Sequence, residues 1–204
     1  MQPKYLQPYR QSHEEHGNNF EVTLWANQQT QKRRFDVFTQ MCFFTGKRVL
    51  DAGCSRGDFA AYLQEQEILY ERFVGIDALA EVVTFAKERR LAETEFHHGD
   101  FLADPGLFIS YRPQIITLSG TLNTMTDEEV TQTLEAAWEG ASEAIIFNFL
   151  SSRCGEKAPK VILPVRRLDP IQLLKWSMVK TTDVAFRQDY FPHGHDATIL
   201  LKKT

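Results

Sequence analysis

The sequence predicts an α/β fold in which a mostly parallel sheet is covered by helices on both faces. From Lys47 onward, short apolar runs alternate with amphipathic segments, a pattern typical of parallel strands joined by helices. The last two runs are joined by a short link containing Gly194, which favours an antiparallel hairpin. The 204 residues, 43% hydrophobic and 25% charged, have the composition of one soluble globular domain.

The chain begins with 26 mostly polar residues that include prolines and a glycine, so we expect an irregular arm there. Asn27 is expected to cap a helix that ends near Phe44. We therefore expect an N-terminal arm with a lid helix over residues 1–45 and a main domain over residues 46–204.

Seven apolar runs in the main domain have the length and composition of strands. They are 47–51, 72–76, 94–98, 113–119, 143–150, 181–188 and 197–203. Helices are expected between them because apolar residues recur there at helical spacing, as after Asp58. Thr126 and Glu129 have the spacing of a capping box, and Pro170 fits the first position of the last helix. The residues of that helix expected to face the core are Ile171, Leu174 and Met178.

Charge and cysteine content exclude several classes of protein. The net charge of −4 argues against a general polyanion binder, so nucleic acid is not an expected partner. Cys42, Cys54 and Cys154 have neither zinc-finger nor redox spacing, which indicates reduced thiols and a cytoplasmic location. No secretory signal is present at the N-terminus and no apolar run approaches the ~20 residues of a membrane helix, so no membrane association is expected.

Ligands of such sheets bind beyond the carboxyl ends of the parallel strands. The first strand runs through VLDAGCSRG (49–57) into a helix, and Gly53 and Gly57 allow the backbone to approach a ligand closely. Asp58 stands where a dinucleotide-binding fingerprint has its third glycine. Asp51 would repel a pyrophosphate, so this turn suits a cationic ligand.

The next strand ends at Asp77, 20 residues beyond Gly57, where a carboxylate can accept hydrogen bonds from ribose hydroxyls or cap the following helix. After the third strand, Asp100 can accept from an exocyclic amine and Phe101 can pack on a purine, although aspartate is also common in turns. The fourth strand is followed by small and hydroxylic residues, SGTLN (119–123).

Together, VLDAGCSRG, GID, GDF and IITLSGTLN resemble the motifs of class I S-adenosylmethionine (SAM)-dependent methyltransferases over residues 46 to 204. The resemblance implies a Rossmann-like seven-stranded sheet of order 3-2-1-4-5-7-6 with strand 7 antiparallel, SAM as cofactor and S-adenosylhomocysteine as product. The motif residues implied to bind the cofactor are Asp51, Ala52, Gly53, Cys54, Ser55, Gly57, Asp77, Ala78, Asp100, Phe101, Ser119, Gly120 and Thr121.

More loosely, WANQQTQKRRF (25–35), SGTLN, FNFLS and DYFPHGHDATILL resemble a group of bacterial methyltransferases with unassigned substrates. The chain departs from the general pattern at Ser55, where a glycine is usual, and at Gln114, where an acid usually opens the fourth strand. No Asn/Asp-Pro-Pro-aromatic or Pro-Cys motif follows that strand, which argues against methylation of DNA bases.

On the lid helix, Gln31 and Arg34 share a face with Phe35 and Phe38, so Arg34 is expected to be buried and to need a partner. That partner is either a cofactor carboxylate or a structural aspartate or backbone carbonyl. We expect Trp25 and Arg34 to close the methionine end of the cofactor. The residues expected to contact the acceptor are Gln31, Asn123 and Asn148.

Because a sulfonium methyl is already activated, transfer is expected to proceed by in-line displacement, with a base needed only for some acceptors. The candidate bases are Tyr190, His193 and His195. Two histidines do not make a metal site, so no metal is expected. Residues 151–167 carry five basic side chains and one acidic one, which is explained either by an anionic acceptor or by a solvated loop. We expect a small-molecule acceptor and a monomer or homodimer.

Two other functions fit parts of the sequence. Gly53–Gly57 also matches the G-x-S-x-G elbow of α/β-hydrolases, with Ser55 as nucleophile. Its partners would come from Asp183, Asp189, His193 and His195. Only one strand precedes this turn and no glycine-rich oxyanion loop lies upstream, which argues against a hydrolase. The second alternative is a catalytically silent module that binds SAM.

Overall fold

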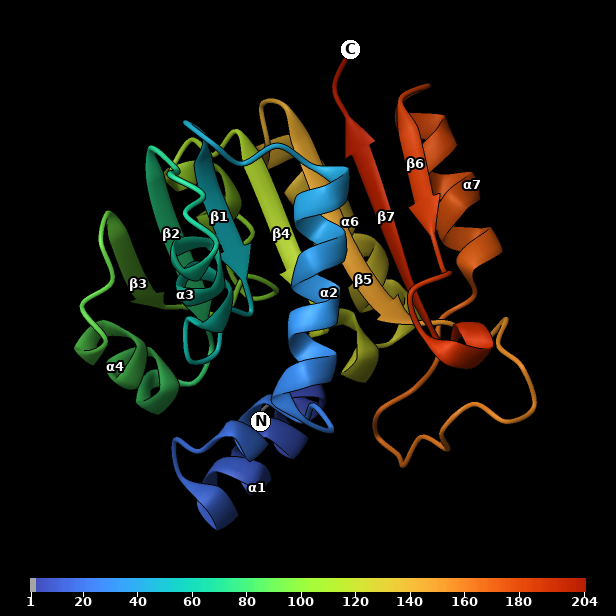
Figure 1. Cartoon of the computed structure of the whole chain (residues 1–204), viewed down its shortest axis with the longest axis horizontal. Helices are drawn as coiled ribbons and strands as arrows, with labels where there is room; N and C mark the ends of the chain where they lie inside the picture. The colour runs from blue at the N-terminus through green and yellow to red at the C-terminus, as the bar shows by residue number, and fades with distance from the viewer. Residues whose placement is uncertain (1–2) are drawn as a thin grey trace.

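The computed structural model describes residues 3–204, so the first two residues of the expected arm lie outside it. Its centre is one seven-stranded sheet of order β3-β2-β1-β4-β5-β7-β6 (Figure 1). The strands are β1 (Arg48–Ala52), β2 (Arg72–Asp77), β3 (Thr94–His98), β4 (Ile115–Ser119), β5 (Ala144–Leu150), β6 (Val184–Arg187) and β7 (Asp196–Lys202). Strands β1 to β5 pair in parallel, whereas β7 is antiparallel to both β5 and β6. The predicted fold class is confirmed.

Helices cover both faces because alternate residues of the central strands are buried on opposite sides. Val49 packs in the core under α2 (Gln28–Met41) and α3 (Asp58–Glu65), whereas Leu50 packs in the core of the other face. The remaining helices are α4 (Ala80–Glu88), α5 (Leu107–Ser110), α6 (Asp127–Gly140) and α7 (Pro170–Lys180). The predicted capping box of Thr126 and Glu129 is confirmed at the start of α6. Among residues 3–204, no helix combines the length and apolarity needed to cross a membrane.

The N-terminal segment is helical, so the expectation of an irregular arm was wrong. It comprises 3₁₀ turns at Lys4–Leu6 and Phe20–Thr23 on either side of α1 (Gln7–His16). The features that suggested irregularity mark the ends of α1, since Pro8 lies in its first turn and Gly17 follows its last residue. In Figure 1, α1 lies beyond the carboxyl ends of the parallel strands.

The inward face of α7 also differs from the prediction. Leu173 and Ser177 are buried, whereas Ile171 and Met178 are 45% and 64% exposed. Apolar residues occur on both sides of this helix, so their spacing did not fix which side faces the sheet. Leu174 lies at the margin of the core.

Candidate functional site

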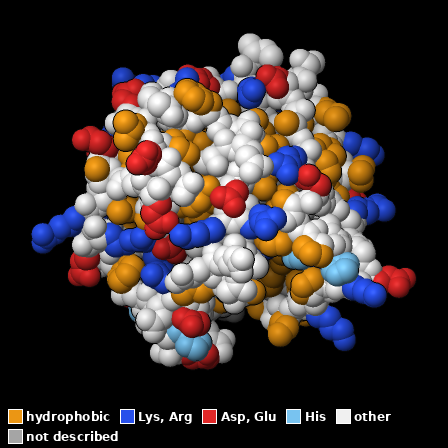
Figure 2. Space-filling view, in the orientation of Figure 1, with side chains coloured by type: hydrophobic (Ala, Val, Ile, Leu, Met, Phe, Trp, Pro, Cys, Tyr) orange, Lys and Arg blue, Asp and Glu red, His pale blue; other side chains and the backbone are white. Residues whose placement is uncertain are grey.

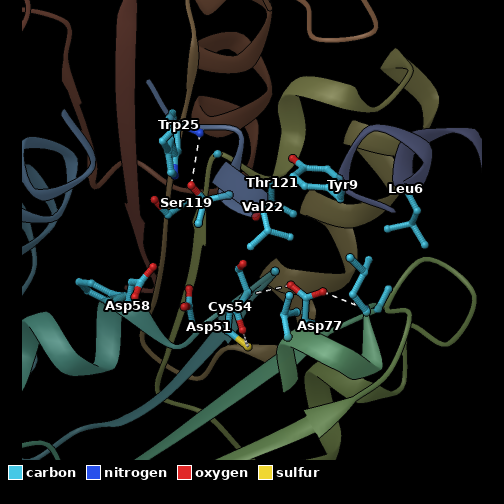
Figure 3. Close-up of a pocket in the computed structure, with 18 of the residues that line it drawn as sticks. Leu6, Tyr9, Val22, Trp25, Asp51, Cys54, Asp58, Asp77, Ser119 and Thr121 are labelled. Carbon is cyan, nitrogen blue, oxygen red and sulfur yellow. Dashed lines mark hydrogen bonds between the residues drawn. The ribbon is translucent and has the colours of Figure 1, made fainter. Parts of the chain in front are cut away.

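A cavity of about 810 Å³, part of which is open to solvent, lies at the carboxyl ends of β1, β2 and β4 (Figure 3). One side, which we call the floor, consists of residues that follow the strands: Asp51, Gly53, Cys54, Ser55, Asp58, Asp77, Ala78, Phe101, Ser119, Gly120 and Thr121. The opposite side, which we call the roof, comes from the N-terminal segment: Tyr5, Leu6, Tyr9, Val22, Thr23 and Trp25.

The turn after β1 is packed tightly against the loop after β4. Gly53 has a φ of +81°, and a Cβ atom there would lie 2.6 Å from Oγ1 of Thr121. The hydroxyl of Thr121 donates to the carbonyl of Ala52 at 2.8 Å, and the N–H groups of Gly53 and Cys54 donate to the carbonyl of Ile76. A side chain at position 53 would therefore push the two loops of the floor apart.

Two residues of this motif do not line the cavity. Ala52 is fully buried in the core. At Gly57, a Cβ atom would lie 2.7 Å from Cζ of Phe96, so this glycine serves the packing of α3 against β3. Neither residue is placed to contact a ligand, unlike their neighbours Gly53 and Ser55.

Asp77 joins the turn after β1 to the turn after β2. Its Oδ2 accepts from the N–H of Ser55 at 2.8 Å, and its Oδ1 accepts from the N–H of Leu79 at 2.9 Å. Burial raises the pKa of this carboxyl, although the two backbone hydrogen bonds oppose the shift. Asp77 thus organises the turn before α4 and also faces the cavity (Figure 3), as both of its proposed roles require.

Asp51 is only 3% exposed and lines the cavity at the end of β1. The hydroxyl of Thr117 donates to its Oδ1 at 2.7 Å. Desolvation raises the pKa of Asp51 to about 7, with smaller upward contributions from Asp77 and Asp58. Three carboxylates line the cavity, and among residues 3–204 no lysine, arginine or histidine does. Asp58 is paired at 2.7 Å with Arg89, which lies outside the lining, so Asp51 and Asp77 are the two carboxyl groups that suit a cationic ligand.

The motif after β3 is divided between the cavity and the roof. Phe101 lines the cavity, but Asp100 does not. The hydroxyl of Tyr5 donates to Oδ1 of Asp100, which also accepts from the N–H of Leu102 at 3.0 Å. Burial, followed by this hydrogen bond, raises the pKa of Tyr5. Asp100 therefore holds the roof, and its position outside the cavity lining gives no support to the expected contact with the adenine.

The N-terminal segment contributes more to the cavity than the sequence indicated. Trp25 was expected at this site, whereas the contributions of Leu6 and Val22 were missed. In Figure 3, Val22 and Tyr9 lie across the cavity from Asp77. The sequence offered one indication of a helix here, the i, i+4 spacing of Tyr5 and Tyr9. This pattern spans a single helical turn, and that turn contains Pro8.

Trp25 and Gln31 line the cavity, whereas Arg34 does not. The guanidinium of Arg34 donates from Nε and Nη2 to the two carboxylate oxygens of Asp196, at 2.7 Å and 2.5 Å. Its Nη1 donates to the carbonyl of Thr30 at 2.8 Å. Of the two partners considered for this buried arginine, the structural aspartate is the one present.

The two asparagines expected in the acceptor site instead brace the loop after β4. Oδ1 of Asn148 accepts from the N–H of Gly120 at 2.7 Å. Oδ1 of Asn123 accepts from the N–H of Leu150 at 2.9 Å. Neither asparagine lines the cavity, in contrast to Ser119, Gly120 and Thr121.

The candidate bases also lie outside the cavity lining. The hydroxyl of Tyr190 is paired with Oγ1 of Thr198 at 2.9 Å, and burial raises its pKa. His195 is bonded through Nδ1 to the carbonyl of Pro192 at 2.9 Å, and His193 is exposed. Because no described histidine lines the cavity that contains Ser55, the catalytic triad of a hydrolase is not assembled there.

The basic loop after β5 is held together by its own arginines. Arg166 donates to Asp127 at 2.6 Å and to the carbonyl of Met125 at 2.5 Å. Arg167 bonds the carbonyls of Ser151, His195 and Pro159. Neither arginine lines the cavity, so the loop gives no support to an anionic acceptor.

Comparisons with known proteins address the fold and the motif region. Residues 49–140 match the family model described as a methyltransferase domain. None of the curated proteins matches the chain significantly. Several solved structures share its fold at low sequence identity. An O-methyltransferase family protein from Burkholderia thailandensis has a TM-score of 0.74 at 14% identity, over 99% of this chain and 64% of that one.

Two other structures cover most of both chains. The magnesium protoporphyrin IX methyltransferase ChlM from Synechocystis PCC 6803, with bound SAM, has a TM-score of 0.71 at 14% identity, over 100% of this chain and 99% of that one. A SAM-dependent methyltransferase from Archaeoglobus fulgidus has a TM-score of 0.66 at 14% identity, over 90% of this chain and 98% of that one.

Proposed function

We propose that this chain, which carries a methyltransferase domain of the class I Rossmann-like fold, binds SAM in the cavity and transfers its methyl group to a small molecule. The observation that carries the proposal is the floor, where Asp51 and Asp77 lie beside a glycine turn without a salt-bridge partner and with no cationic side chain among the described lining residues. SAM bears a sulfonium and an ammonium group. The SAM bound to the Synechocystis methyltransferase supports the same ligand.

The lining residues fit the parts of this cofactor. Asp77 would accept hydrogen bonds from the ribose hydroxyls, and Asp51 would face the ammonium group. Phe101 would pack on the adenine, with Tyr5 and Leu6 covering it from the roof. Gly53 and Gly120 let Thr121 and Trp25 pack directly on the turns that carry these contacts. Bound SAM would supply an activated methyl group for in-line displacement.

The protein would contribute alignment and exclusion of water rather than a base. Aromatic and aliphatic side chains of the roof cover the carboxylates of the floor, and the candidate bases lie elsewhere. Alignment of reactants can supply about 7–11 kcal/mol of a barrier. We therefore propose acceptors that need no early loss of a proton to this chain.

A small-molecule acceptor is further supported by the surface. Figure 2 shows Lys and Arg side chains interspersed with Asp and Glu on the visible face, without the broad basic track that a long nucleic acid needs. The cysteines are free and Cys42 and Cys54 are buried, which supports a reducing compartment such as the cytoplasm.

The test is a SAM titration by calorimetry, followed by a methyl-transfer screen with labelled SAM over amines, phenols, small acids and bulk RNA. We expect SAM binding and transfer to one of the small-molecule classes. A protein that does not bind SAM would contradict the assignment, and transfer to RNA alone would contradict the acceptor class. SAM binding with no transfer to any acceptor would indicate the catalytically silent module.

A further inference from the structure

We propose that Arg34 is a positioning residue of the cavity, which fixes the indole of Trp25 against Gly120 although it does not itself line the cavity. The effect on SAM affinity rests on the proposed function, whereas the effect on Trp25 does not. Three features support this role, namely the anchor of Arg34, its aromatic partners and the contact of the indole with Gly120.

The guanidinium of Arg34 is anchored on every nitrogen. Arg34 is 4% exposed and Asp196 is 0% exposed, so their pairing through two parallel hydrogen bonds is shielded from water. The third nitrogen donates to the carbonyl of Thr30, one turn earlier in α2. The plane of the guanidinium is thereby fixed between α2 and the start of β7.

Two aromatic rings pack against this guanidinium. The guanidinium carbon lies 3.9 Å from the ring centroid of Trp25 and 4.7 Å from that of Phe191. The ring of Phe191 in turn stacks on His195 at 4.9 Å. Arg34 thus connects the roof to the β6–β7 connection through its contacts with Trp25 and Phe191.

The indole of Trp25 also contacts the floor. A Cβ atom built on Gly120 would lie 2.2 Å from its Cζ2 atom, so the ring rests directly on the backbone of the loop after β4. Trp25 therefore contacts both Gly120 and Arg34. Asp196 neutralises the charge of Arg34, so the guanidinium does not attract the ligand electrostatically. Its role is to provide a flat surface that sets the position of the indole.

The test uses a protein in which Trp138 and Trp176 are replaced by phenylalanine, leaving Trp25 as the only one of the three tryptophans. Acrylamide quenching of its fluorescence, without ligand, reports the mobility and exposure of the indole. Arg34→Lys keeps the charge opposite Asp196 but loses the planar face. We expect about twofold stronger quenching and about tenfold weaker SAM binding.

Arg187→Lys is the matched control, because Arg187 makes a comparable two-bond pair with Asp189 on the exposed β6 edge. It is expected to change neither readout. Phe191→Leu provides a second test that leaves the buried ion pair intact, with smaller changes in the same direction. If Arg34→Lys does not fold, Phe191→Leu decides the question.

Unchanged quenching in the folded variants, or a lower melting temperature with unchanged quenching and SAM affinity, would overturn the positioning role. A wild-type protein that fails to bind SAM would contradict the proposed function instead. The quenching comparison would still test Arg34 in that case.

Discussion

The floor and the roof of the cavity are stabilised by different kinds of interaction. The floor follows four neighbouring parallel strands, β3, β2, β1 and β4, and its turns are fixed by close backbone packing and by hydrogen bonds such as those from Ser55 and Leu79 to Asp77. The roof is a helical segment before the first strand, held by side-chain contacts to distant residues. Tyr5 contacts Asp100, and Trp25 contacts Gly120.

This difference separates the effects of mutation. Changes in the floor should alter ligand affinity directly, because its groups face the ligand. Changes in the roof should alter how well the cavity is covered, with smaller effects on affinity. The largest effect is expected where the two meet, at Gly120.

Gly120→Ala should disturb both sides at once. The new Cβ atom would lie 2.2 Å from Trp25, at a φ of +73° that disfavours alanine. We expect the free energy of unfolding to fall by about 2–3 kcal/mol and SAM affinity to fall about 100-fold. Urea unfolding and calorimetry measure the two effects.

Gly46→Ala is the matched control, since Gly46 has a φ of +70° and no atom within 4 Å of the added Cβ. Gly46→Ala should lower the free energy of unfolding by about 1 kcal/mol, because alanine is disfavoured at a positive φ, but its Cβ atom would meet no neighbouring side chain. Equal destabilisation by the two variants, with SAM affinity preserved in Gly120→Ala, would show that Trp25 does not rest on this loop in solution.

Asp77→Ala tests the floor alone. Loss of hydrogen bonds from a carboxylate to two ribose hydroxyls costs about 1.5–3 kcal/mol, so SAM affinity should fall by one to two orders of magnitude. Asp104→Ala is the control, because Asp104 also accepts a backbone hydrogen bond in a turn, from Gly106, but is exposed and outside the cavity lining. An unchanged affinity in Asp77→Ala would contradict the placement of the ribose.

The pH dependence of binding tests the charge of the floor. The raised pKa of Asp51, about 7, means that the carboxyl is largely protonated at pH 5.5 in the free protein. A cationic ligand favours the ionised form, so SAM affinity should rise about tenfold between pH 5.5 and 7.5. Calorimetry at several pH values measures this rise, and Asp51→Asn should abolish it.

Stability should change in the opposite direction. Because the folded state of Asp51 binds its proton more tightly than the unfolded state, its contribution to the free energy of unfolding falls as pH rises from about 4 to about 7. Comparison of wild type with Asp51→Asn by urea unfolding isolates this contribution. If the difference in free energy of unfolding between wild type and Asp51→Asn did not depend on pH, the burial of Asp51 without a cationic partner would be contradicted.

The sheet order and most of the floor were predictable because each floor residue follows a strand with its own motif. Asp51, Gly53 and Asp77 hold the places that their positions in the chain implied. The roof was not predictable in this way. Tyr5 and Asp100 are 95 residues apart, and Arg34 and Asp196 are 162 residues apart, so no local pattern reports either pair.

The same limit explains the roles that changed. Asn123 and Asn148 have amide side chains of the kind that bind ligands. Here they instead accept hydrogen bonds from the N–H groups of Leu150 and Gly120, which are distant in the sequence. A polar side chain can bind a ligand directly, or it can stabilise a loop whose other residues bind the ligand. The residue type alone does not distinguish these two roles. That distinction requires the three-dimensional partners.

Tyr5→Phe should have the smallest effect, because it changes only the attachment of the roof. The phenyl ring keeps its buried position, and only the hydrogen bond to Asp100 is lost. We expect the free energy of unfolding to fall by about 1–1.5 kcal/mol and hydrogen exchange to accelerate in residues 4–23. SAM affinity should change less than threefold, since Asp100 does not line the cavity. Tyr111→Phe is the control, because Tyr111 lies outside the roof. If Tyr5→Phe weakened SAM binding as much as Asp77→Ala, the hydroxyl of Tyr5 would have to be counted with the floor as part of the binding site.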